Sequence, residues 1–158
     1  MLAVELDQND ERVLSELQQD ARITMAELGR RVGLSQPAVT ERVRKLESAG
    51  VITGYHAAVS PARLGYAIRA LVHVGRLDQE RMSPLVEASP EVLNAYCVTG
   101  GDDWVLEIAV ADVTHLEAVL RPFCSLTDTR TAVILRILRE RSPLKSPAAL
   151  RADRTRGR

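Results

Sequence analysis

Apolar residues in the first 50 positions recur three or four residues apart, which is the spacing of one face of an α-helix. The pattern is interrupted twice, so it predicts three short helices rather than one long helix. Asp7, with Asp10 three residues later, is expected to begin the first helix. Three helices with one apolar face each can bury those faces against one another. The expected inward positions are Val13, Leu14, Leu17, Leu28, Val32, Val39, Val43 and Leu46.

The second and third helices have clear end signals. Thr24 and Glu27 have the spacing of a capping box, and Gly33 can leave the helix with a positive φ at little cost. Ser35 is expected to cap the third helix, with Pro37 in its first turn, where a missing N–H is harmless. Two helices joined by so tight a turn are typical of a helix-turn-helix, although an ordinary αα-hairpin has the same pattern.

The outward face of the third helix is polar and basic. In a helix-turn-helix the second helix enters the DNA major groove, so this face would meet base edges and phosphates. We expect Arg42 and Lys45 on phosphates, and the other polar residues near bases. The predicted DNA-binding residues are Ser35, Gln36, Pro37, Thr40, Arg42, Arg44 and Lys45.

The pattern changes after residue 50. Residues 51–60 alternate weakly, which favours a strand or a short wing. From Tyr66 onward, segments with the alternation of strands and segments with the spacing of helices follow one another in the order βαββαβ. This order predicts an α+β protein in which a winged helix-turn-helix is followed by a C-terminal ferredoxin-like domain. Pro84 should either kink the first of these helices or lie in a shorter helix capped by Ser83, and Thr114 should cap the second helix. The expected strands and helices span 66–77, 79–88, 92–99, 103–111, 114–125 and 129–139.

Several of these strands have apolar side chains on both faces, as Leu71 and Val72 illustrate. Helices can cover only one face of such a sheet, so the other face requires a second chain. We therefore expect a homodimer through this domain, unless the second face is mostly polar. The expected domain boundaries are 1–60 for the DNA-binding domain, 61–65 for a hinge, 66–141 for the ligand-sensing domain and 142–158 for a basic, disordered tail.

The chain has 21 basic and 21 acidic side chains and no net charge, which argues against coating nucleic acid through bulk charge. Residues 1–60 have seven basic and nine acidic side chains, so any DNA contact depends on a local patch. Two separate cysteines and no apolar run of membrane length predict a cytoplasmic protein with reduced thiols and no membrane partner. The three histidines lack metal-ligand spacing, so neither a metal nor a cofactor is expected.

The loop between the second and third strands, YCVTGGDDW, has the groups to bind an amino acid. Adjacent glycines at 100 and 101 can present backbone N–H groups to a carboxylate. The carboxylates of Asp102 and Asp103 can pair with an ammonium group. An ordinary hairpin turn has the same composition, so the loop alone leaves both interpretations open.

The stretch LSQPAVTERVRKLESAGVITGYHAAVSPARLG resembles the Lrp/AsnC transcriptional regulators, and the resemblance extends over residues 6 to 141. It implies DNA-binding dimers that assemble further, commonly to octamers, and an amino-acid effector. The family's GxxDY loop is matched by Gly100, Asp103 and Trp104, with tryptophan in place of tyrosine, and its TxT by Thr129 and Thr131. The extra acidity at Asp102 would suit arginine or lysine. The predicted effector-binding residues are Thr99, Gly100, Gly101, Asp102, Asp103, Trp104, Thr129 and Thr131.

These observations predict a sequence-specific, oligomeric regulator of transcription that binds double-stranded DNA, responds to an amino acid and is not an enzyme. One alternative is an architectural DNA-binding protein that wraps DNA and has no effector. A second is a tetrapyrrole decarboxylase of similar layout, which should need histidines that converge on a cleft. The histidines of this chain fall on separate expected elements.

Overall fold

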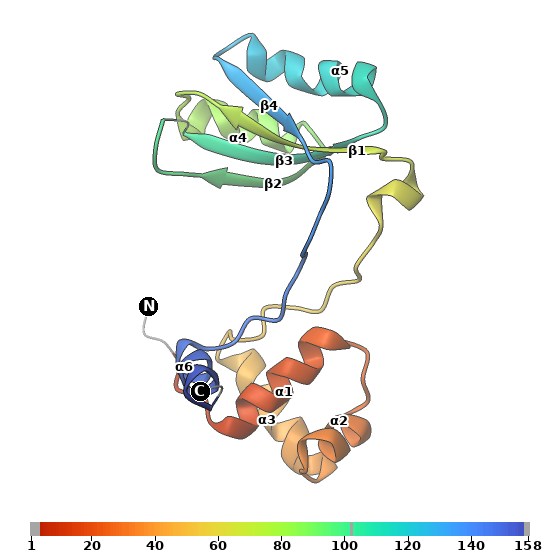
Figure 1. The fold of residues 1–158 in the computed structure, drawn as a ribbon, viewed down its shortest axis with the longest axis vertical. Coiled ribbons are helices and arrows are strands. Elements are labelled where there is room, and N and C mark those ends of the chain that lie inside the picture. Colours follow the sequence, from red (N-terminus) through yellow and green to blue (C-terminus); the bar gives the residue numbers. More distant parts are fainter. Residues whose placement is uncertain (1–3, 102, 157–158) are drawn as a thin grey trace. The chain divides into compact units, whose positions relative to one another are not determined.

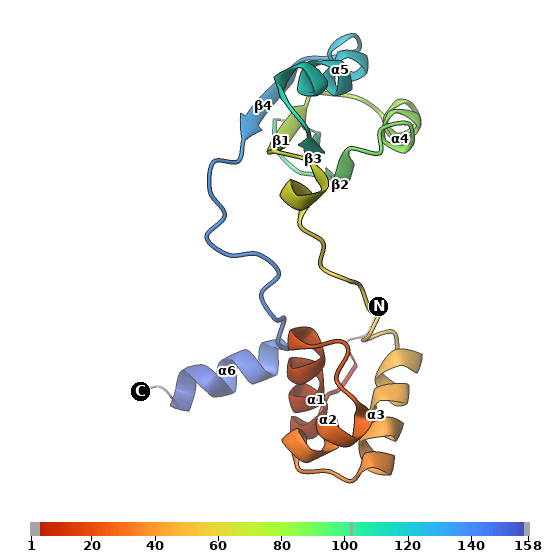
Figure 2. The same cartoon turned by 90° about the vertical axis from the view of Figure 1, so that its right-hand side faces the viewer.

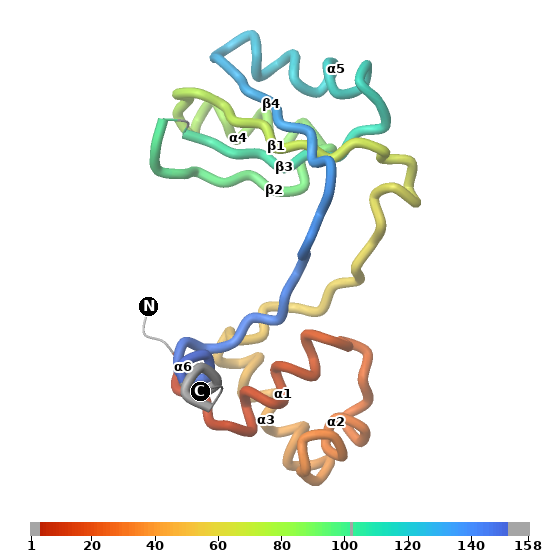
Figure 3. The backbone as a smooth tube through the Cα atoms, in the orientation of Figure 1, coloured from red at the N-terminus to blue at the C-terminus, as the bar shows by residue number. Residues whose placement is uncertain are grey.

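The computed structural model describes residues 4–101 and 103–156, the last five by their backbone alone. The chain forms two compact units. One contains the residues up to Ala57 and those from Arg139, and we call it the helical unit; the other, Ala58–Leu138, is called the sheet unit. Figure 3 follows the backbone as it leaves the helical unit after its third helix and returns to it after the last strand. No helix among the described residues is long and apolar enough to cross a membrane.

Three helices build the core of the helical unit: α1 (Gln8–Gln19), α2 (Met25–Val32) and α3 (Gln36–Ser48). Their inward side chains form one apolar cluster, and α1 crosses the α2–α3 pair as Figure 1 shows. The predicted three-helix unit is therefore confirmed. The buried members of the cluster are Val13, Leu17, Ile23, Leu28, Val32, Val39, Val43 and Leu46.

The helix ends follow from local side-chain chemistry. Asp7 and Asp10 form a reciprocal capping box at α1, and Ser35 accepts the Ala38 N–H at α3, as the sequence predicts. Gly33 ends α2 with φ +76°. Thr24 accepts the Glu27 N–H at α2, as predicted. The second bond of the predicted capping box, from the Thr24 N–H to the Glu27 carboxylate, is wrong, because that carboxylate accepts hydrogen bonds from arginines instead.

The turn between α2 and α3 depends on a close backbone approach. The Leu34 N–H donates to the Gly29 carbonyl over 2.8 Å. A Cβ at Gly29 would lie 2.7 Å from the Leu34 carbonyl oxygen, well inside van der Waals contact. Glycine at position 29 therefore lets the two helices meet at the angle of a helix-turn-helix.

After α3, residues 53–60 have no regular secondary structure, so the predicted strand or wing over 51–60 is wrong. The Val51 and Ile52 N–H groups still donate to the Leu46 carbonyl, which turns the chain back over the helices. Residues 53–60 pair with no strand in the described part of the chain, and an unpaired segment gains no ladder of hydrogen bonds. The expected hinge contains a 3₁₀ turn, η1 (Pro61–Leu64).

The C-terminal residues contradict the predicted disordered tail. They include a helix, α6 (Pro147–Arg156), whose first turn is capped by Ser146 through the Ala149 N–H at 3.2 Å. Ahead of it, Leu144 exchanges two hydrogen bonds with the side-chain amide of Gln18 on α1, at 2.7 and 2.9 Å. Figure 2 shows α6 starting beside α1 and projecting from the helical unit. Ser-Pro at a helix start and the alanines that follow favour this helix.

The sheet unit has four antiparallel strands in the order β2-β3-β1-β4. With α4 (Gln79–Glu87) and α5 (Val113–Cys124), they give the predicted βαββαβ sequence of elements. Both helices pack on one face through Met82, Val119 and Phe123, against buried strand residues such as Val72 and Leu106. The strands are β1 (Ile68–Val74), β2 (Val92–Cys97), β3 (Trp104–Val110) and β4 (Thr129–Val133).

In this unit α4 begins at Gln79, as expected from the span 79–88, and α5 begins earlier than expected, at Val113. Asp78 caps α4, and Pro84 lies inside this one helix rather than starting a shorter helix. The Asp112 carboxylate accepts the His115 N–H and caps α5, so the predicted Thr114 cap is wrong. Aspartate is among the preferred N-cap residues, and the cap at Asp112 lets the helix begin at Val113.

The last strand is shorter than predicted. β4 ends at Val133, opposite Ala70 of β1, and the Ile134 N–H still donates to the Arg69 carbonyl at 2.8 Å. Among the described residues, none after Ile134 pairs with a strand, so the chain leaves the sheet there. Leu135 is 94% exposed and Leu138 is 89% exposed there.

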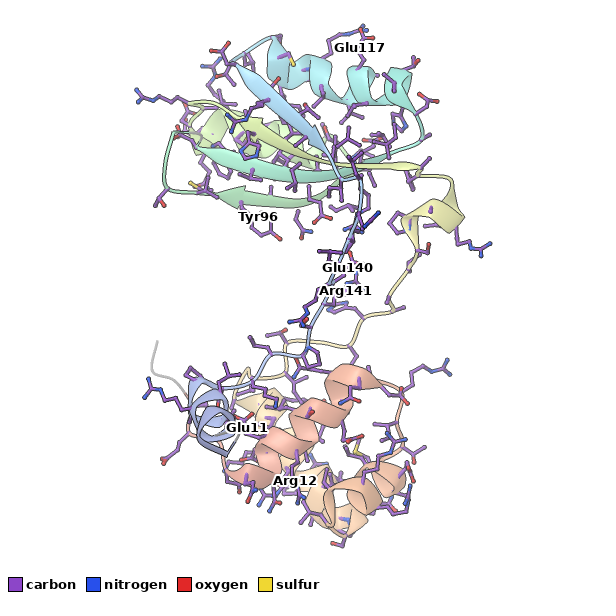
Figure 4. The ribbon with its side chains drawn as sticks, viewed as in Figure 1. Glu11, Arg12, Tyr96, Glu117, Glu140 and Arg141 are labelled. Carbon is purple, nitrogen blue, oxygen red and sulfur yellow. The ribbon has the colours of Figure 1, made fainter. Side chains whose placement is uncertain are left out.

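The sheet face away from the helices is mixed rather than wholly apolar. Arg69 pairs with Glu107 at its centre, and the Asn94 amide donates to the same carboxylate over 2.9 Å. Leu71 is half-buried on this face, and Tyr96 projects from β2 as Figure 4 shows. The alternative of a polar second face is therefore partly correct, and the most exposed large apolar side chains among the described residues are Leu135 and Leu138, after β4.

Candidate functional site

The outward face of α3 is open to solvent over its first two turns. Ser35, Gln36 and Pro37 are exposed at its N-terminus, and Thr40 is half-buried because its hydroxyl bonds back to the Gln36 carbonyl at 2.8 Å. The N-terminus of a helix presents unpaired N–H groups and a positive dipole end. A phosphate or a base edge can therefore approach this end of α3 without displacing any contact of the fold.

Two cations extend this surface along α3. Arg44 and Lys45 are exposed, and the only ion pair that Arg44 makes among the described residues is a loose one with Glu41, at 3.7 Å. A pair of this kind, with both side chains more than 70% exposed, contributes little to stability. Both cations can leave their positions for a nucleic acid at small cost.

Arg42 differs from the other predicted DNA-binding residues. Its guanidinium donates to Asp7 and to Asp10, both at 2.7 Å, and so joins α3 to the N-terminus of α1. The Asp10 N–H and, after it, Arg42 lower the pKa of Asp7 below its ordinary value. The predicted phosphate contact of Arg42 therefore competes with an interhelical ion pair.

A second cluster of charges lies on α2. Glu27 accepts hydrogen bonds from Arg30 and Arg31, and Arg31 also reaches Glu16 of α1. The bond from Arg30, and then that from Arg31, lower the pKa of Glu27 to about 2. These arginines thus carry their charge near the helix-turn-helix while they stabilise its packing.

The second candidate site is at one end of the strands rather than along an outer strand, and we call this end the sheet edge. The hairpin between β2 and β3 is closed by the Val98 N–H, which donates to the Asp103 carbonyl at 2.9 Å. Gly100 has φ +129°, a conformation that glycine adopts readily, and Thr99, Gly100 and Gly101 are exposed. Asp103 is half-buried, and Asp102 lies outside the described residues.

The strand register places the two halves of the predicted effector site at the same edge. Trp104 on β3 and Thr129 on β4 are both opposite Val74 of β1, which separates them. Neighbouring strands are about 4.8 Å apart, so the two residues lie about 10 Å from each other. Thr131, one pleat further in, is exposed on the edge strand.

Trp104 and Thr129 each have a contact that the sequence did not indicate. The Trp104 indole N–H donates to the Leu77 carbonyl at 2.8 Å, which fixes the ring against the loop that precedes α4. The Thr129 hydroxyl lies 2.9 Å from the Cys124 sulfur at the end of α5. The Trp104 contact joins residues 27 apart in sequence, and the Thr129 contact joins the end of α5 to the start of β4, five residues later.

The loop after β1 completes this edge. The Gly75 N–H donates to the Asp128 carbonyl at 2.9 Å, so residues 75–78 lie beside the residues that lead into β4. Arg76 is exposed in that loop, and no ion-pair partner for it appears among residues 4–101 and 103–156. The edge therefore combines backbone N–H groups, hydroxyls, carboxylates and a cation, which are the groups that bind a zwitterion.

Comparison with known families matches both units. Residues 6–53 match the winged helix-turn-helix DNA-binding model, and residues 70–144 match the Lrp/AsnC ligand binding domain. The HTH-type transcriptional regulator Rv2324 of Mycobacterium tuberculosis is 38% identical over 144 residues, 87% of this chain and 97% of the relative.

Two solved structures extend the likeness to whole chains. The transcriptional regulator NMB0573 of Neisseria meningitidis, in complex with L-Met, aligns with a TM-score of 0.84 at 25% identity, over 92% of this chain and 99% of its own. The feast or famine regulatory protein Rv3291c of M. tuberculosis, complexed with L-methionine, aligns with a TM-score of 0.79 at 35% identity, over 86% and 96%.

Proposed function

The chain belongs to the Lrp/AsnC family of DNA-binding transcriptional regulators, and we propose that it regulates transcription in response to an α-amino acid bound at the sheet edge. The observation that carries the proposal is the pairing of two exposed polar surfaces in one chain. One is the basic face of α3, and the other is the edge that joins the hairpin at residues 98–103 with Thr129 and Thr131. The relatives are transcriptional regulators, and none of those compared is an enzyme.

For the DNA contacts, we propose that the exposed side chains of α3 read the major groove. Arg44 contacts a base edge and Lys45 a phosphate, while Ser35 and Gln36 act from the helix N-terminus. Arg44→Ala should then weaken binding to the preferred duplex by about 1–3 kcal/mol and relax preference at one base pair. Lys45→Ala should weaken binding to every duplex equally.

For the effector, the support is the chemistry of the edge together with the L-methionine complexes of two relatives. The N–H groups around Gly100 and Gly101 would hold the carboxylate, and Asp103 the ammonium group. The hydroxyls of Thr129 and Thr131 would complete the site. The acidic loop favours an amino acid with a cationic side chain, such as arginine or lysine.

For the assembly, we propose a homodimer that covers the apolar segment after β4. Val133, Leu135 and Leu138 are exposed on one chain, and a second copy would remove them from water. Dimers of dimers, up to an octamer, would follow the family pattern and would place several copies of α3 along one DNA duplex.

The first experiment is a thermal-unfolding screen of the purified full chain against the twenty amino acids. A ligand that binds only the folded protein stabilises it by about 2.7 kcal/mol at a hundred times its dissociation constant. We expect one or a few amino acids to raise the transition temperature. The same amino acids should change the affinity for a duplex recovered from a random-sequence selection.

The matched variants are Asp103→Asn and Glu117→Gln. Both remove one carboxylate, but Glu117 lies on the outer surface of α5, away from the edge, where Figure 4 labels it. Asp103→Asn should abolish the shift, and Glu117→Gln should retain it. Sequence-specific binding that no amino acid changes would contradict the effector proposal and favour an architectural DNA-binding protein.

A further inference from the structure

The helical unit is connected to the sheet unit twice along the chain. The first connection follows α3 and leads into β1, and the second follows β4 and returns to the helical unit (Figure 3). At the sheet, the two connections meet neighbouring strands, because the Ile134 N–H donates to the Arg69 carbonyl at 2.8 Å. A single connection lets two units rotate about its bonds, whereas a second connection excludes every orientation that would separate its ends.

Each connection is fixed to a different helix. On the first, the Tyr55 hydroxyl donates to the Glu47 carboxylate of α3 at 2.8 Å. On the second, the Gln18 side-chain amide of α1 accepts from the Leu144 N–H at 2.7 Å and donates to the Leu144 carbonyl at 2.9 Å. An amide that pairs with both backbone groups of one residue fixes the position and the orientation of that residue. The second connection therefore ends at a defined point on the helical unit.

The sequence around Leu144 supports this contact. Pro143 precedes Leu144, and a proline fixes its own φ and restricts the residue before it to extended conformations. On the other side, the Ser146 hydroxyl accepts the Ala149 N–H at 3.2 Å and begins α6. The backbone is therefore restricted on both sides of the residue that Gln18 binds.

The C-terminal segment also lines an open hollow beside α1, together with residues 51–57. Residues up to 57 have seven basic and nine acidic side chains, a net charge of −2. Residues 139–158 have seven basic and two acidic side chains, so the complete helical unit has a net charge of +3. Because DNA affinity depends on charge, a test of the Gln18–Leu144 contact must leave every charge in place.

The contact limits how far the helical unit can move from the sheet. Residues 135–143 separate Ile134 from Leu144, and an extended chain spans at most about 3.6 Å per residue. Leu144, and α1 with it, therefore stays within about 36 Å of the end of β4, which is about one turn of DNA. Without the contact, only the first connection would restrict the helical unit.

We propose that Gln18 is a positioning residue for DNA recognition, whose contact with Leu144 restricts the helical unit and so sets the spacing of the half-sites that a dimer reads. In a dimer each α3 reads one half-site, so the distance between the two helical units decides which spacing fits. Helical units that are held by two connections accept one spacing, whereas units held by one connection accept several. The inference rests on the proposed DNA contacts and on the proposed homodimer.

The test is binding to duplexes in which the two half-sites are moved apart, measured by fluorescence anisotropy. The half-sites are the repeated element of a duplex that the full chain selects from random sequences. Inserting five base pairs, about half a turn, places the second half-site on the opposite face of the duplex. For the unmodified chain the affinity should fall about 100-fold, because the advantage of two linked contacts is lost.

Gln18→Met removes both hydrogen bonds, keeps the length of the side chain and changes no charge. Its matched control is Gln19→Met, since Gln19 is exposed on the same helix and its amide contacts Ser15, at 3.5 Å. Loss of two hydrogen bonds lowers the ratio of attached to detached segment about 30-fold. The insertion should therefore cost Gln18→Met about tenfold or less in affinity, and Gln19→Met about 100-fold, as in the unmodified chain.

A duplex with a single half-site distinguishes positioning from stability. Gln18→Met, Gln19→Met and the unmodified chain should bind it equally, because α3 is the same in all three. Weaker binding of Gln18→Met to this duplex would overturn the inference, since Gln18 would then stabilise the helical unit rather than position it. An equal spacing profile in Gln18→Met and Gln19→Met would also overturn it, because the contact would restrict nothing.

Failure of the underlying proposals has a different signature. Selected duplexes without a repeated element would contradict the proposed homodimer, and the inference with it. A full chain that selects no sequence would contradict the proposed DNA contacts. Both results come from the unmodified chain, before any variant is compared.

Discussion

Replacing Arg42 by alanine separates the stability of the helical unit from its DNA contacts. Asp10 is 5% exposed and accepts hydrogen bonds from the Asp7 N–H at 3.1 Å and from Arg42 at 2.7 Å. Without Arg42, the Asp10 carboxylate keeps only the backbone donor. Breaking a buried ion pair by removing one partner typically costs about 3–5 kcal/mol, because the remaining charge is left without compensation.

The expected loss is smaller here because water reaches part of the cluster. The side chain of Arg42 is 29% exposed and that of Asp7 is 53% exposed. We therefore expect Arg42→Ala to lower the free energy of unfolding of the helical unit by about 2 kcal/mol. With a urea dependence of about 1 kcal/mol per molar for so small a unit, the unfolding midpoint should fall by about 2 M.

Two optical signals can distinguish the units. Trp104 is the single tryptophan and lies in the sheet unit, so its fluorescence follows that unit alone. Far-ultraviolet circular dichroism at 222 nm is dominated by helices and so includes the helical unit. Arg42→Ala should move the dichroism transition and leave the fluorescence transition in place. Arg44→Ala, a control on the same helix, should leave both transitions within about 0.5 kcal/mol.

The reasoning would be refuted by the opposite pattern. If Arg42→Ala unfolds as the unmodified chain does but loses affinity for every duplex, Arg42 is a phosphate contact whose ion pair opens on binding. Arg44→Ala should show the complementary behaviour, with unchanged stability and weaker binding to the selected duplex.

Three other substitutions test separate parts of the structure. The pKa of Glu27 falls from 4.5 to about 2 on folding, so the stability that its ionised carboxylate contributes is complete above pH 4.5 and is lost as the pH falls towards 2. Glu27→Gln should flatten the fall in helical dichroism over that range, and a pH profile equal to that of the unmodified chain would contradict this prediction. Gly29→Ala should cost about 1–3 kcal/mol of helical-unit stability, because its Cβ would lie 2.7 Å from the Leu34 carbonyl oxygen; an unshifted dichroism transition in urea would show that the turn relaxes freely. Trp104→Phe removes the hydrogen bond to the Leu77 carbonyl and should cost the sheet unit about 1 kcal/mol in calorimetry, whereas a loss below 0.3 kcal/mol would make that contact incidental.

Features set by neighbours in sequence could be predicted from the sequence. The caps at Asp7, Thr24 and Ser35 and the turn at Gly33 depend on side chains within four residues, and all four are confirmed. The order of strands and helices followed from periodicity in the same way. The hairpin around Gly100 could be located because its two strands adjoin in the chain.

Features that depend on distant partners could not be predicted. Arg42 had the appearance of a solvated recognition-helix cation because Asp10 is 32 residues away. The Trp104 indole donates to the Leu77 carbonyl, 27 residues away, which no local pattern specifies. β4 ends at Val133 although the apolar residues continue to Leu138, and strand length cannot be derived from apolar alternation alone.

The helix α6 was missed for a different reason. Pro147 follows Ser146 and stands at the first helical position, where proline is favoured. The same Ser-to-proline signal was used correctly at Ser35 and Pro37. Its context differed, because basic residues without apolar periodicity follow Pro147.

The discontinuous helical unit has a consequence for the order in which the protein is made. Gln18 and its partner Leu144 are 126 residues apart, so at 5–20 residues per second the ribosome adds the second about 6–25 s after the first. The sheet unit is continuous and can fold within that interval. The hollow beside α1 lacks the C-terminal part of its lining until that segment is made. Until residues 139–158 emerge, the three helices of the helical unit carry a net charge of −2. The helical unit therefore acquires its net positive charge only when this segment has been synthesised.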